Sequence, residues 1–166
     1  MDIDPDTIRL RDLRIGDAGW LIQQHGELYA RDEGFDASFE ALVAEILADF
    51  IRNRDPACER AWIAETDGQR LGSIFCVRSG DPGIAKLRLF LLIPAARGLG
   101  LGQRLLSECI DFARSTGNHT LRLWTHQSHR AACALYQRSG FVCTKSEPVT
   151  SFGVPLVEQT WERHLT

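Results

Sequence analysis

Hydrophobic and polar residues alternate with two different periods along the chain, and the period indicates which segments form strands and which form helices. Residues 7–13 (TIRLRDL) alternate apolar and charged side chains, as a half-buried strand does. A helix is expected over residues 18–29, with Asp17 as its N-cap and the segment ARDEGFDAS as its end. A second helix is expected after Asp36, its N-cap, because apolar residues then recur at helical spacing. These residues are Phe39, Leu42, Val43, Ile46, Leu47 and Phe50.

The middle of the chain has the pattern of three strands. Residues 59–83 contain two short β-rich runs joined by Asp67 and Gly68, a dipeptide that favours a tight hairpin turn. Residues 84–94 (IAKLRLFLLIP) alternate at first and then become continuously apolar, which is typical of a central strand. Pro94 ends this strand because it has no N–H group to donate.

The last third of the chain predicts two helices and three strands. The apolar residues from Leu101 to Ser115 fall on one helix face, and Gly117 supplies the stop. A shorter helix is expected between Ser128, its N-cap, and Gly140, the residue after its end. The strands of this region are residues 120–125, 141–148 and 155–165.

The predicted order is therefore strand, two helices, three strands, helix, strand, helix and two strands. No repeat, low-complexity tract or linker interrupts it. Such elements bury their apolar faces when helices cover both faces of one mixed sheet. The pattern predicts an α/β fold and a single domain over residues 1–166, a length at which one hydrophobic core suffices without disulfides or a metal.

Composition narrows the class of partner. Of the 166 residues 44% are hydrophobic and 25% are charged, which excludes a largely disordered chain. A formal net charge of -3 favours neither nucleic acid nor an anionic membrane, so the expected partners are small molecules. The first residues, MDIDPDTIRL, do not resemble a signal peptide, and no apolar run approaches the roughly 20 residues that cross a bilayer.

The cysteines are odd in number and scattered, and none forms a CxxC or a cysteine-histidine pair at metal-ligand spacing. They are Cys58, Cys76, Cys109, Cys133 and Cys143. A reducing compartment is the simplest fit, so we expect a cytoplasmic protein that uses no metal.

Residues 97–102 (RGLGLG) place a glycine at every second position where the central strand turns into the next helix. Glycines there leave backbone N–H groups unpaired at the positive end of a helix, and a ligand can approach them without meeting a Cβ atom. The spacing fits neither a GxGxxG dinucleotide loop nor a phosphate loop that ends in GlyLys[Ser/Thr]. The segment predicts an anion-binding turn or, as the alternative, only a tight turn with close helix packing.

The stretch LLIPAARGLGLGQRLL resembles the acyl-CoA-binding motif of the GNAT superfamily of N-acetyltransferases, Arg/Gln-x-x-Gly-x-Gly/Ala, which Arg97, Gly100 and Gly102 match. Downstream, LRLWT and AACALYQRSGF resemble the family's next motif, in which a helix carries a tyrosine just before GlyPhe. The element order is also that of the family, so the resemblance spans the whole chain. It is closest to the acetyltransferase domains fused behind MarR-type regulators, although this chain begins too late to include their DNA-binding module.

The resemblance implies a GNAT fold, a splayed mixed sheet of about seven strands with about four helices, and acetyl-CoA as the co-substrate. In this family the strand before the loop pairs with the pantetheine arm, and the loop N–H groups hold the diphosphate. The residues implied for pairing are Leu91, Leu92 and Ile93, and those implied for the loop are Arg97, Gly98, Leu99, Gly100, Leu101 and Gly102. The guanidinium of Arg97 would add a cationic contact, and its alternative is a solvated surface position.

Tyr136 matches the general acid of the family. Transfer proceeds by attack of a neutral amine on the acetyl thioester, and the departing thiolate needs a proton. A phenol has a pKa of about 10, so it is protonated at neutral pH and can donate that proton. The alternative interpretation of Tyr136 is an amphipathic core residue beside Leu135.

The sequence departs from the family pattern at two places. His129 stands where many relatives have an asparagine that contacts the pantetheine arm, and a neutral imidazole still offers one donor or acceptor there. Residues 86–93 lack the carboxylate that serves some relatives as general base. The general base is therefore either a chain of water molecules or one of several side chains. The candidate side chains are Glu27, Glu33, His25 and His126.

Residues 25–36 (HGELYARDEGFD) lie where relatives build the acceptor pocket, and their carboxylates and aromatics suit a cationic amine with an apolar portion. They fit an ordinary polar loop equally well. Lys86 and Arg88 would instead hold a substrate carboxylate. An amino acid or a small polyfunctional amine as acceptor satisfies both features. The N-terminus of a protein or peptide is the alternative acceptor.

The leading hypothesis is a catalytic N-acetyltransferase acting on a primary amine. The alternative is a non-catalytic acyl-CoA-binding domain, a sensor or interaction partner, for which His129 and the missing carboxylate leave room. A DNA-binding regulator is disfavoured by the net charge and by the lack of a helix-turn-helix pattern. Trp124 and Trp161 are expected in the core, and the alternative for Trp161 is the surface of a homodimer.

Overall fold

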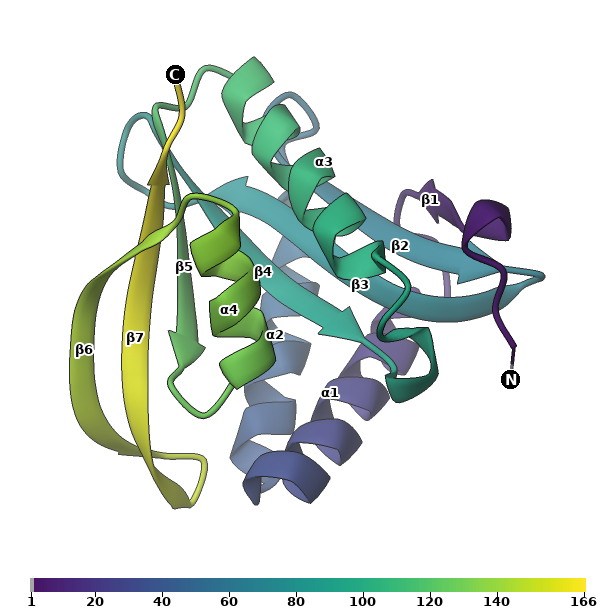
Figure 1. Ribbon diagram of the computed structural model, residues 1–166, viewed down its shortest axis with the longest axis horizontal. Coiled ribbons are helices and arrows are strands. Elements are labelled where there is room, and N and C mark those ends of the chain that lie inside the picture. The colour runs from purple at the N-terminus through teal and green to yellow at the C-terminus, as the bar shows by residue number, and fades with distance from the viewer. Residues whose placement is uncertain (1) are drawn as a thin grey trace.

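Seven strands form one sheet in the computed structural model, which describes residues 2–166, and four helices pack on it (Figure 1). Met1, the first residue of the predicted domain, lies outside the described residues. The strands are β1 (Arg9–Arg11), β2 (Arg60–Thr66), β3 (Gln69–Arg78), β4 (Ile84–Leu92), β5 (Thr120–His126), β6 (Val142–Ser151) and β7 (Val154–His164). The helices are α1 (Asp17–Glu33), α2 (Ala37–Asn53), α3 (Leu101–Ser115) and α4 (Arg130–Arg138). The predicted order of elements is confirmed.

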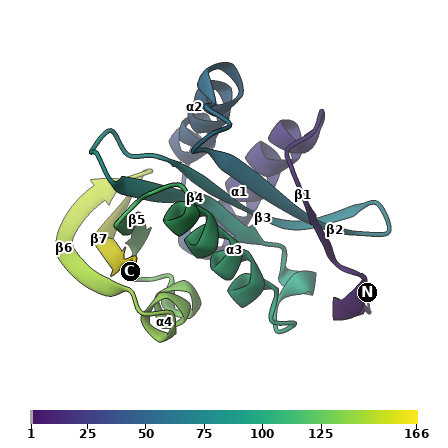
Figure 2. The same ribbon diagram turned by 90° about the horizontal axis from the view of Figure 1, so that it is seen from above.

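The sheet is mixed, with the strand order β1-β2-β3-β4-β5-β7-β6. All neighbouring strands run antiparallel except β4 and β5, which run parallel. A parallel pair needs a crossover connection, and α3 supplies it. Figure 2 shows α1 and α2 on one face of the sheet and α3 and α4 on the other. The α/β architecture with helices on both faces is therefore as predicted.

Each face of the sheet has its own hydrophobic cluster. On one face Val43 and Leu47 of α2 pack with Ile63 and Phe75 of the sheet. On the other face α3 buries the stripe that its periodicity predicts. This stripe is Leu101, Leu105, Leu106, Cys109, Ile110 and Ala113. Each fully buried aliphatic side chain of this size contributes roughly 1.5–3 kcal/mol to folding. Within residues 2–166 no helix combines the length and apolar character that crossing a bilayer requires.

Helix α1 differs from its prediction at both ends. Gly16 is the N-cap, so Asp17 is the first helical residue rather than the cap. The helix also runs past residue 29 to Glu33, because Gly34 in the left-handed conformation (φ 75°) donates its N–H to the carbonyl groups of Tyr29 and Ala30. This extra turn places Glu33 on a helix instead of in the predicted loop.

The N-caps of the other helices are partly as predicted. Asp36 caps α2, because its carboxylate accepts the N–H of Ser38 at 2.9 Å. Ser128 does not cap α4. The chain makes one more turn after β5, in which the N–H of Arg130 donates to the Ser128 carbonyl at 2.9 Å, and His129 becomes the N-cap.

The predicted turns are in place, and the first strand is shorter than expected. Asp67 and Gly68 have positive φ values of 48° and 73°, as a two-residue hairpin turn requires. Gly140, with φ 86°, follows the last residue of α4 and its C-cap. Strand β1 covers only Arg9–Arg11, because its pairing with β2 ends there.

The two tryptophans of the predicted strands have different environments. Trp161 is 9% exposed and its Nε1 donates to the Gln159 side chain at 3.1 Å, so it belongs to the core and not to a surface between subunits. Trp124 is 48% exposed, contrary to the prediction of a core residue. Its ring lies 4.2 Å below the ammonium of Lys86, on the part of the sheet where β4 and β5 part.

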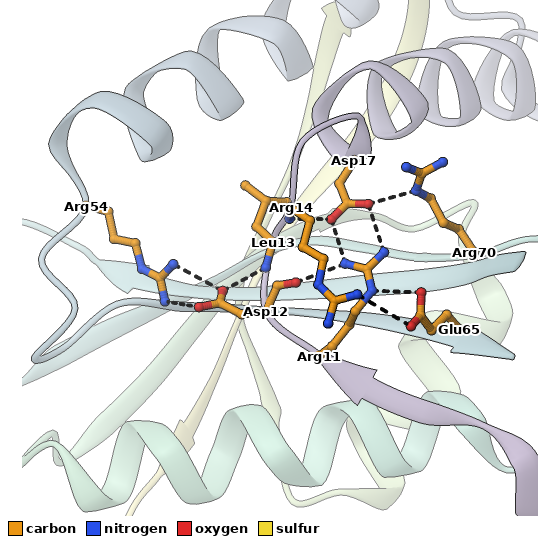
Figure 3. A network of polar contacts seen from close by, with 8 residues as sticks. All are labelled: Arg11, Asp12, Leu13, Arg14, Asp17, Arg54, Glu65 and Arg70. Carbon is orange, nitrogen blue, oxygen red and sulfur yellow. Dashed lines mark hydrogen bonds and ion pairs between the residues drawn. The ribbon is translucent and has the colours of Figure 1, made fainter. Parts of the chain in front are cut away.

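A buried carboxylate ties the start of α1 to the sheet (Figure 3). Asp17 is fully buried and accepts hydrogen bonds from Arg11 Nη1 at 2.8 Å and Arg70 Nε at 2.7 Å. The backbone N–H of Arg14 also donates to it, at 2.6 Å. Burial alone raises the pKa of Asp17, but the bonds from Arg11 and Arg70 outweigh burial and hold this pKa below its ordinary value. The carboxylate therefore anchors the helix to β1 and β3.

The two central strands separate halfway along their length, as Figure 1 shows. Their pairing extends only from Ile84 with Thr120 to Lys86 with Arg122. Beyond it β4 contains a bulge at Leu89, whose φ is 48°, and Ser73 Oγ donates to the Leu89 carbonyl at 2.6 Å. A bulge bends the strand that carries it. The splayed sheet that the resemblance implies is thus present, and it opens the sheet at its centre.

Candidate functional site

A cavity of about 770 Å³ lies where β4 and β5 separate. Its walls come from β4, β5, β7, α1, α2, α4 and the start of α3, so segments distant in sequence meet here. Small-molecule sites typically measure roughly 300–1,000 Å³. The predicted site residues that line the cavity are Leu91, Leu92, Arg97, Gly102, His129 and Tyr136. The others lie beside it in the chain without lining it, namely Ile93, Gly98, Leu99, Gly100 and Leu101.

The turn before α3 presents backbone N–H groups to a ligand. The first hydrogen bond of α3 runs from the N–H of Arg104 to the carbonyl of Gly100, at 3.1 Å. The N–H groups of Leu101, Gly102 and Gln103 therefore have no partner within the helix. N–H groups in this position, at the positive end of a helix dipole, bind anions such as a diphosphate.

Two exposed arginines line the cavity. Arg97 is exposed and lines the cavity from the turn, and Arg130 lines it from the first residue of α4. The backbone N–H of Arg97 donates to the carbonyl of Pro94 at 3.2 Å, so it is not free for a ligand, and the guanidinium is what this residue offers. The guanidinium groups can pair with phosphate oxygens in a planar, bidentate manner. Arg130 escaped the sequence analysis because an exposed arginine at a helix start has no distinguishing pattern.

The glycines of the turn differ in backbone conformation and in the space around them. Gly98 and Gly100 have φ values of 78° and 76°, and a Cβ atom on either would meet no protein atom within 4 Å. At Gly102 a Cβ would lie 3.4 Å from Leu135 and 3.5 Å from Leu92, which are ordinary contact distances, so packing does not require a glycine there. The open space beside Gly98 and Gly100 favours the anion-binding interpretation of the turn.

Gly100→Ala is expected to weaken acetyl-CoA binding by tenfold or more while the protein stays folded. A left-handed alanine costs about 1–2 kcal/mol, and its methyl group would occupy the space where the ligand approaches. Gly117→Ala is the matched control, because Gly117 also has a positive φ (87°) and open space around its Cβ, but lies at the far end of α3. Calorimetric titration should show weaker binding for Gly100→Ala alone. Equal losses in both variants would contradict a ligand at the turn.

One edge of β4 is free beside the cavity. On its other edge β4 pairs with β3 through Leu91 and Leu92, whereas β5 follows β4 only as far as Lys86. A free strand edge can pair with an amide-containing ligand as another strand would. Ile93 is less available, because its N–H donates to the carbonyl of Leu71 at 2.9 Å. The geometry leaves the predicted pairing to Leu91 and Leu92.

Tyr136 reaches the cavity from α4 while most of its ring is in the core. It is 4% exposed, and its ring packs at centroid distances of 5.6 Å from Phe141, 6.3 Å from Phe90 and 6.4 Å from Trp161. Burial raises the pKa of Tyr136 above its ordinary value. The hydroxyl therefore stays protonated throughout the neutral range, as a proton donor must.

His129 pairs with a carboxylate from α1. Its Nε2 lies 3.4 Å from Oε1 of Glu33, and its ring packs 4.8 Å from that of Tyr29. Burial lowers the pKa of His129, and the negative charge of Glu33 opposes this only in part. The imidazole is therefore mostly neutral at pH 7, in the position where the family resemblance implies an asparagine.

The four candidate bases differ in whether they line the cavity and whether their side chains already have a partner. Glu33 and His126 line it, and the Nδ1 of His126 is, among residues 2–166, the one fully buried side-chain polar atom without a hydrogen-bond partner. His25 also lines it, but Nδ1 of its ring donates to the Leu21 carbonyl at 2.7 Å, and burial lowers its pKa to about 4. Glu27 is exposed and bonds to Gln23, away from the cavity.

Four aromatic rings form what we call the aromatic chamber, Tyr29, Phe35, Phe39 and Phe152, with neighbouring centroids 4.5–5.5 Å apart. Phe152 comes from the β6–β7 turn, and its carbonyl accepts the N–H of Asp36 at 3.0 Å, which docks this hairpin on α2. Three of the rings line the cavity. The sequence analysis missed Phe152 because a single phenylalanine in a hairpin turn does not show what it packs against.

The comparisons with known proteins agree with this geometry. A model of the acetyltransferase (GNAT) family matches residues 22–141. An uncharacterized N-acetyltransferase of Schizosaccharomyces pombe is 28% identical over 132 residues, which cover 79% of this chain and 78% of that protein.

Two solved structures have the same fold. An N-acetyltransferase from Kribbella flavida superposes with a TM-score of 0.75 and 25% identity, over 98% of this chain and all of that one. An acetyltransferase from Salmonella typhimurium, solved with its cofactor acetyl-CoA, has a TM-score of 0.72 and 20% identity, over 96% of this chain and 95% of that one. The predicted fold is thereby confirmed. Among the described residues no three His, Cys, Asp or Glu side chains are grouped so as to hold a metal ion.

Proposed function

Because the chain belongs to the acetyltransferase (GNAT) family, we propose that it transfers the acetyl group of acetyl-CoA to the primary amine of a small molecule or amino acid. The observation that carries this proposal is the cavity between β4 and β5, which has free N–H groups at one end and Tyr136 in its wall. The domain is proposed to extend over residues 1–166, and the protein to be cytoplasmic and homodimeric. A closer relation to the MarR-fused acetyltransferase domains is likewise a proposal, and only the sequence motifs support it.

The cofactor carries an acetyl group activated as a thioester. The protein positions the thioester and the amine and supplies the groups that transfer protons. The N–H groups of Leu101, Gly102 and Gln103 hold the diphosphate, with Arg97 beside them. The free edge of β4 aligns the pantetheine arm, so that the thioester lies in the cavity. Tyr136 donates its proton to the departing sulfur as the bond between carbon and sulfur breaks.

The nitrogen of the tetrahedral intermediate then loses a proton, which replaces the one that Tyr136 gives to sulfur. A further proton leaves the incoming ammonium ion before attack. Glu33 and His126 are the cavity groups placed to accept it, directly or through water. Burial and the neighbouring His129 lower the pKa of His126, so that its imidazole is neutral at pH 7, and its Nδ1 has no hydrogen-bond partner among residues 2–166. Loss of this proton leaves the nitrogen lone pair free to attack the thioester carbonyl.

Release of free coenzyme A thiol in the presence of acetyl-CoA and a panel of amines tests the proposed function. We expect release above the hydrolytic background for at least one amine, with an acetylated product of the corresponding mass. Amino acids, polyamines, aryl amines and a peptide N-terminus would form the panel. Tight binding of acetyl-CoA without thiol release for any amine would contradict catalysis and favour the acyl-CoA sensor.

The proposed homodimer is tested separately, because light scattering measures the oligomeric state.

A further inference from the structure

The acceptor side of the cavity contains an arginine on the opposite face of the sheet from the glycine turn. Arg88 of β4 lines the cavity and lies directly across from Phe75 of β3. Cross-strand neighbours point to the same face, and Phe75 packs in the cluster under α2. Arg88 therefore enters the cavity from the α2 side, whereas Tyr136 enters it from the α4 side.

Arg88 has no ion-pair partner within 4.0 Å among residues 2–166, although it is only partly exposed. Other partly buried arginines of the sheet are paired, such as Arg11 with Asp17 and Arg122 with Glu162. Asp49 acts on Arg88 only at longer range. A desolvated cation without a partner costs free energy that an anion would offset.

A second cation lies beside Arg88 on the same strand face. The ammonium of Lys86 sits 4.2 Å above the ring of Trp124, which also lines the cavity. Burial, and then repulsion by Arg88 and Arg122, lower the pKa of Lys86 to about 8. Two cations thus lie on this face of β4, of which Arg88 lines the cavity and Lys86 does not, whereas the carboxylates Asp32, Glu33 and Glu158 line it from α1 and β7.

The rest of the acceptor side is apolar. Tyr29, Phe39 and Phe152 of the aromatic chamber line it, together with Val43 and Ile46 of α2. Resting on the proposed function, we propose that Arg88 binds the carboxylate of an acceptor amino acid whose large apolar side chain packs in the cavity against the rings of Tyr29, Phe39 and Phe152. The amine of this acceptor then lies between Arg88 and Tyr136, where β4 and β5 part.

A matched pair of amines tests this assignment, because phenylalanine and 2-phenylethylamine differ only in the carboxylate. We expect the wild-type kcat/KM to be at least tenfold higher for phenylalanine. Arg88→Met should lower kcat/KM for phenylalanine roughly 10- to 100-fold, since a charge-assisted hydrogen bond is lost, and leave 2-phenylethylamine nearly unchanged. Arg88→Lys should restore part of the preference, because it keeps the charge without the bidentate geometry.

The matched control is Arg60→Met, which removes an exposed arginine that packs on Phe112 outside the cavity and should leave the preference intact. Equal use of both amines by the wild type, or an equal loss for both in Arg88→Met, would overturn the assignment.

Binding of 3-phenylpropionate, which has the carboxylate and ring but no amine, gives a readout that does not need turnover. In calorimetry it should bind the wild type and bind Arg88→Met at least tenfold more weakly. Equal binding to both, or none to the wild type, would overturn the carboxylate site. A wild type that binds 3-phenylpropionate through Arg88 but acetylates no amine would overturn the proposed function and leave the site standing.

Discussion

Replacing Tyr136 by phenylalanine should lower kcat by roughly 10²–10⁴-fold, the range that a positioned proton donor contributes. The variant removes one oxygen atom and keeps the ring that packs against Phe90, Phe141 and Trp161. The affinity for acetyl-CoA and the unfolding temperature should therefore stay close to wild type. Steady-state kinetics with the best amine of the panel, together with calorimetric titration of acetyl-CoA, measure these quantities separately.

The pH dependence of kcat gives a second test of Tyr136 as the proton donor. Because burial raises the pKa of Tyr136 above about 10, the wild-type enzyme should lose no activity through ionisation of this phenol between pH 7 and roughly 9. A turnover number that is unchanged in Tyr136→Phe would remove the hydroxyl from the mechanism. In that case Tyr136 is a core residue, as the alternative interpretation of the sequence has it.

Asp17→Asn should destabilise the fold by about 3–5 kcal/mol, a large part of the stability of an ordinary domain. The substitution keeps the shape of the side chain but removes the fully buried carboxylate that Arg11 and Arg70 share, so that Arg11 keeps only Glu65 as a counter-charge. Asp12→Asn is the matched control, since Asp12 pairs with Arg54 and its side chain is 55% exposed. That surface pair should contribute less than about 1 kcal/mol. Urea denaturation of the three proteins measures the difference.

The same network predicts how acid affects stability. The pKa of Asp17 is lower in the folded state than in the unfolded chain, so its contribution is complete above the unfolded value of about 4 and is lost as the pH falls through the folded value. The wild type should therefore lose its stability advantage over Asp17→Asn below pH 4 or so. Equal stabilities of the two proteins at pH 7 would contradict the anchoring role of Asp17.

Much of the candidate site was predictable because short stretches of neighbouring residues indicate it. Gly98 and Gly100 mark a turn that needs positive φ, and the stripe of α3 marks the helix that follows. Tyr136 was identified through a motif of contiguous residues. Ile93 belonged to the same stretch, and yet its N–H is used inside the protein, which no local pattern could reveal.

The remaining features depend on contacts between distant segments. Phe152 reaches the aromatic chamber only because the β6–β7 hairpin docks on α2, and Arg88 is unpaired only because no carboxylate lies within reach of it among the described residues. Asp17 was predicted as a helix cap, since its preference for that position is real, but two arginines from β1 and β3 bind it instead. In each case the local preference was correct for the residue type, and the partner came from elsewhere.

The sequence by itself determined the order of strands and helices, the buried face of α3, most of that of α2 apart from the exposed Leu42, and the glycine turn, because periodicity and backbone preference are properties of neighbouring residues. Only the tertiary structure decided what the cavity contains. The strand order sets β4 beside β5 and then parts them after Lys86, and that separation brings Glu33, Arg88 and Tyr136 to one space. The physical reason is that the burial and charge neutralisation of a side chain depend on contacts with residues distant in sequence. Sequence periodicity indicates only the face of the helix or strand on which each residue lies.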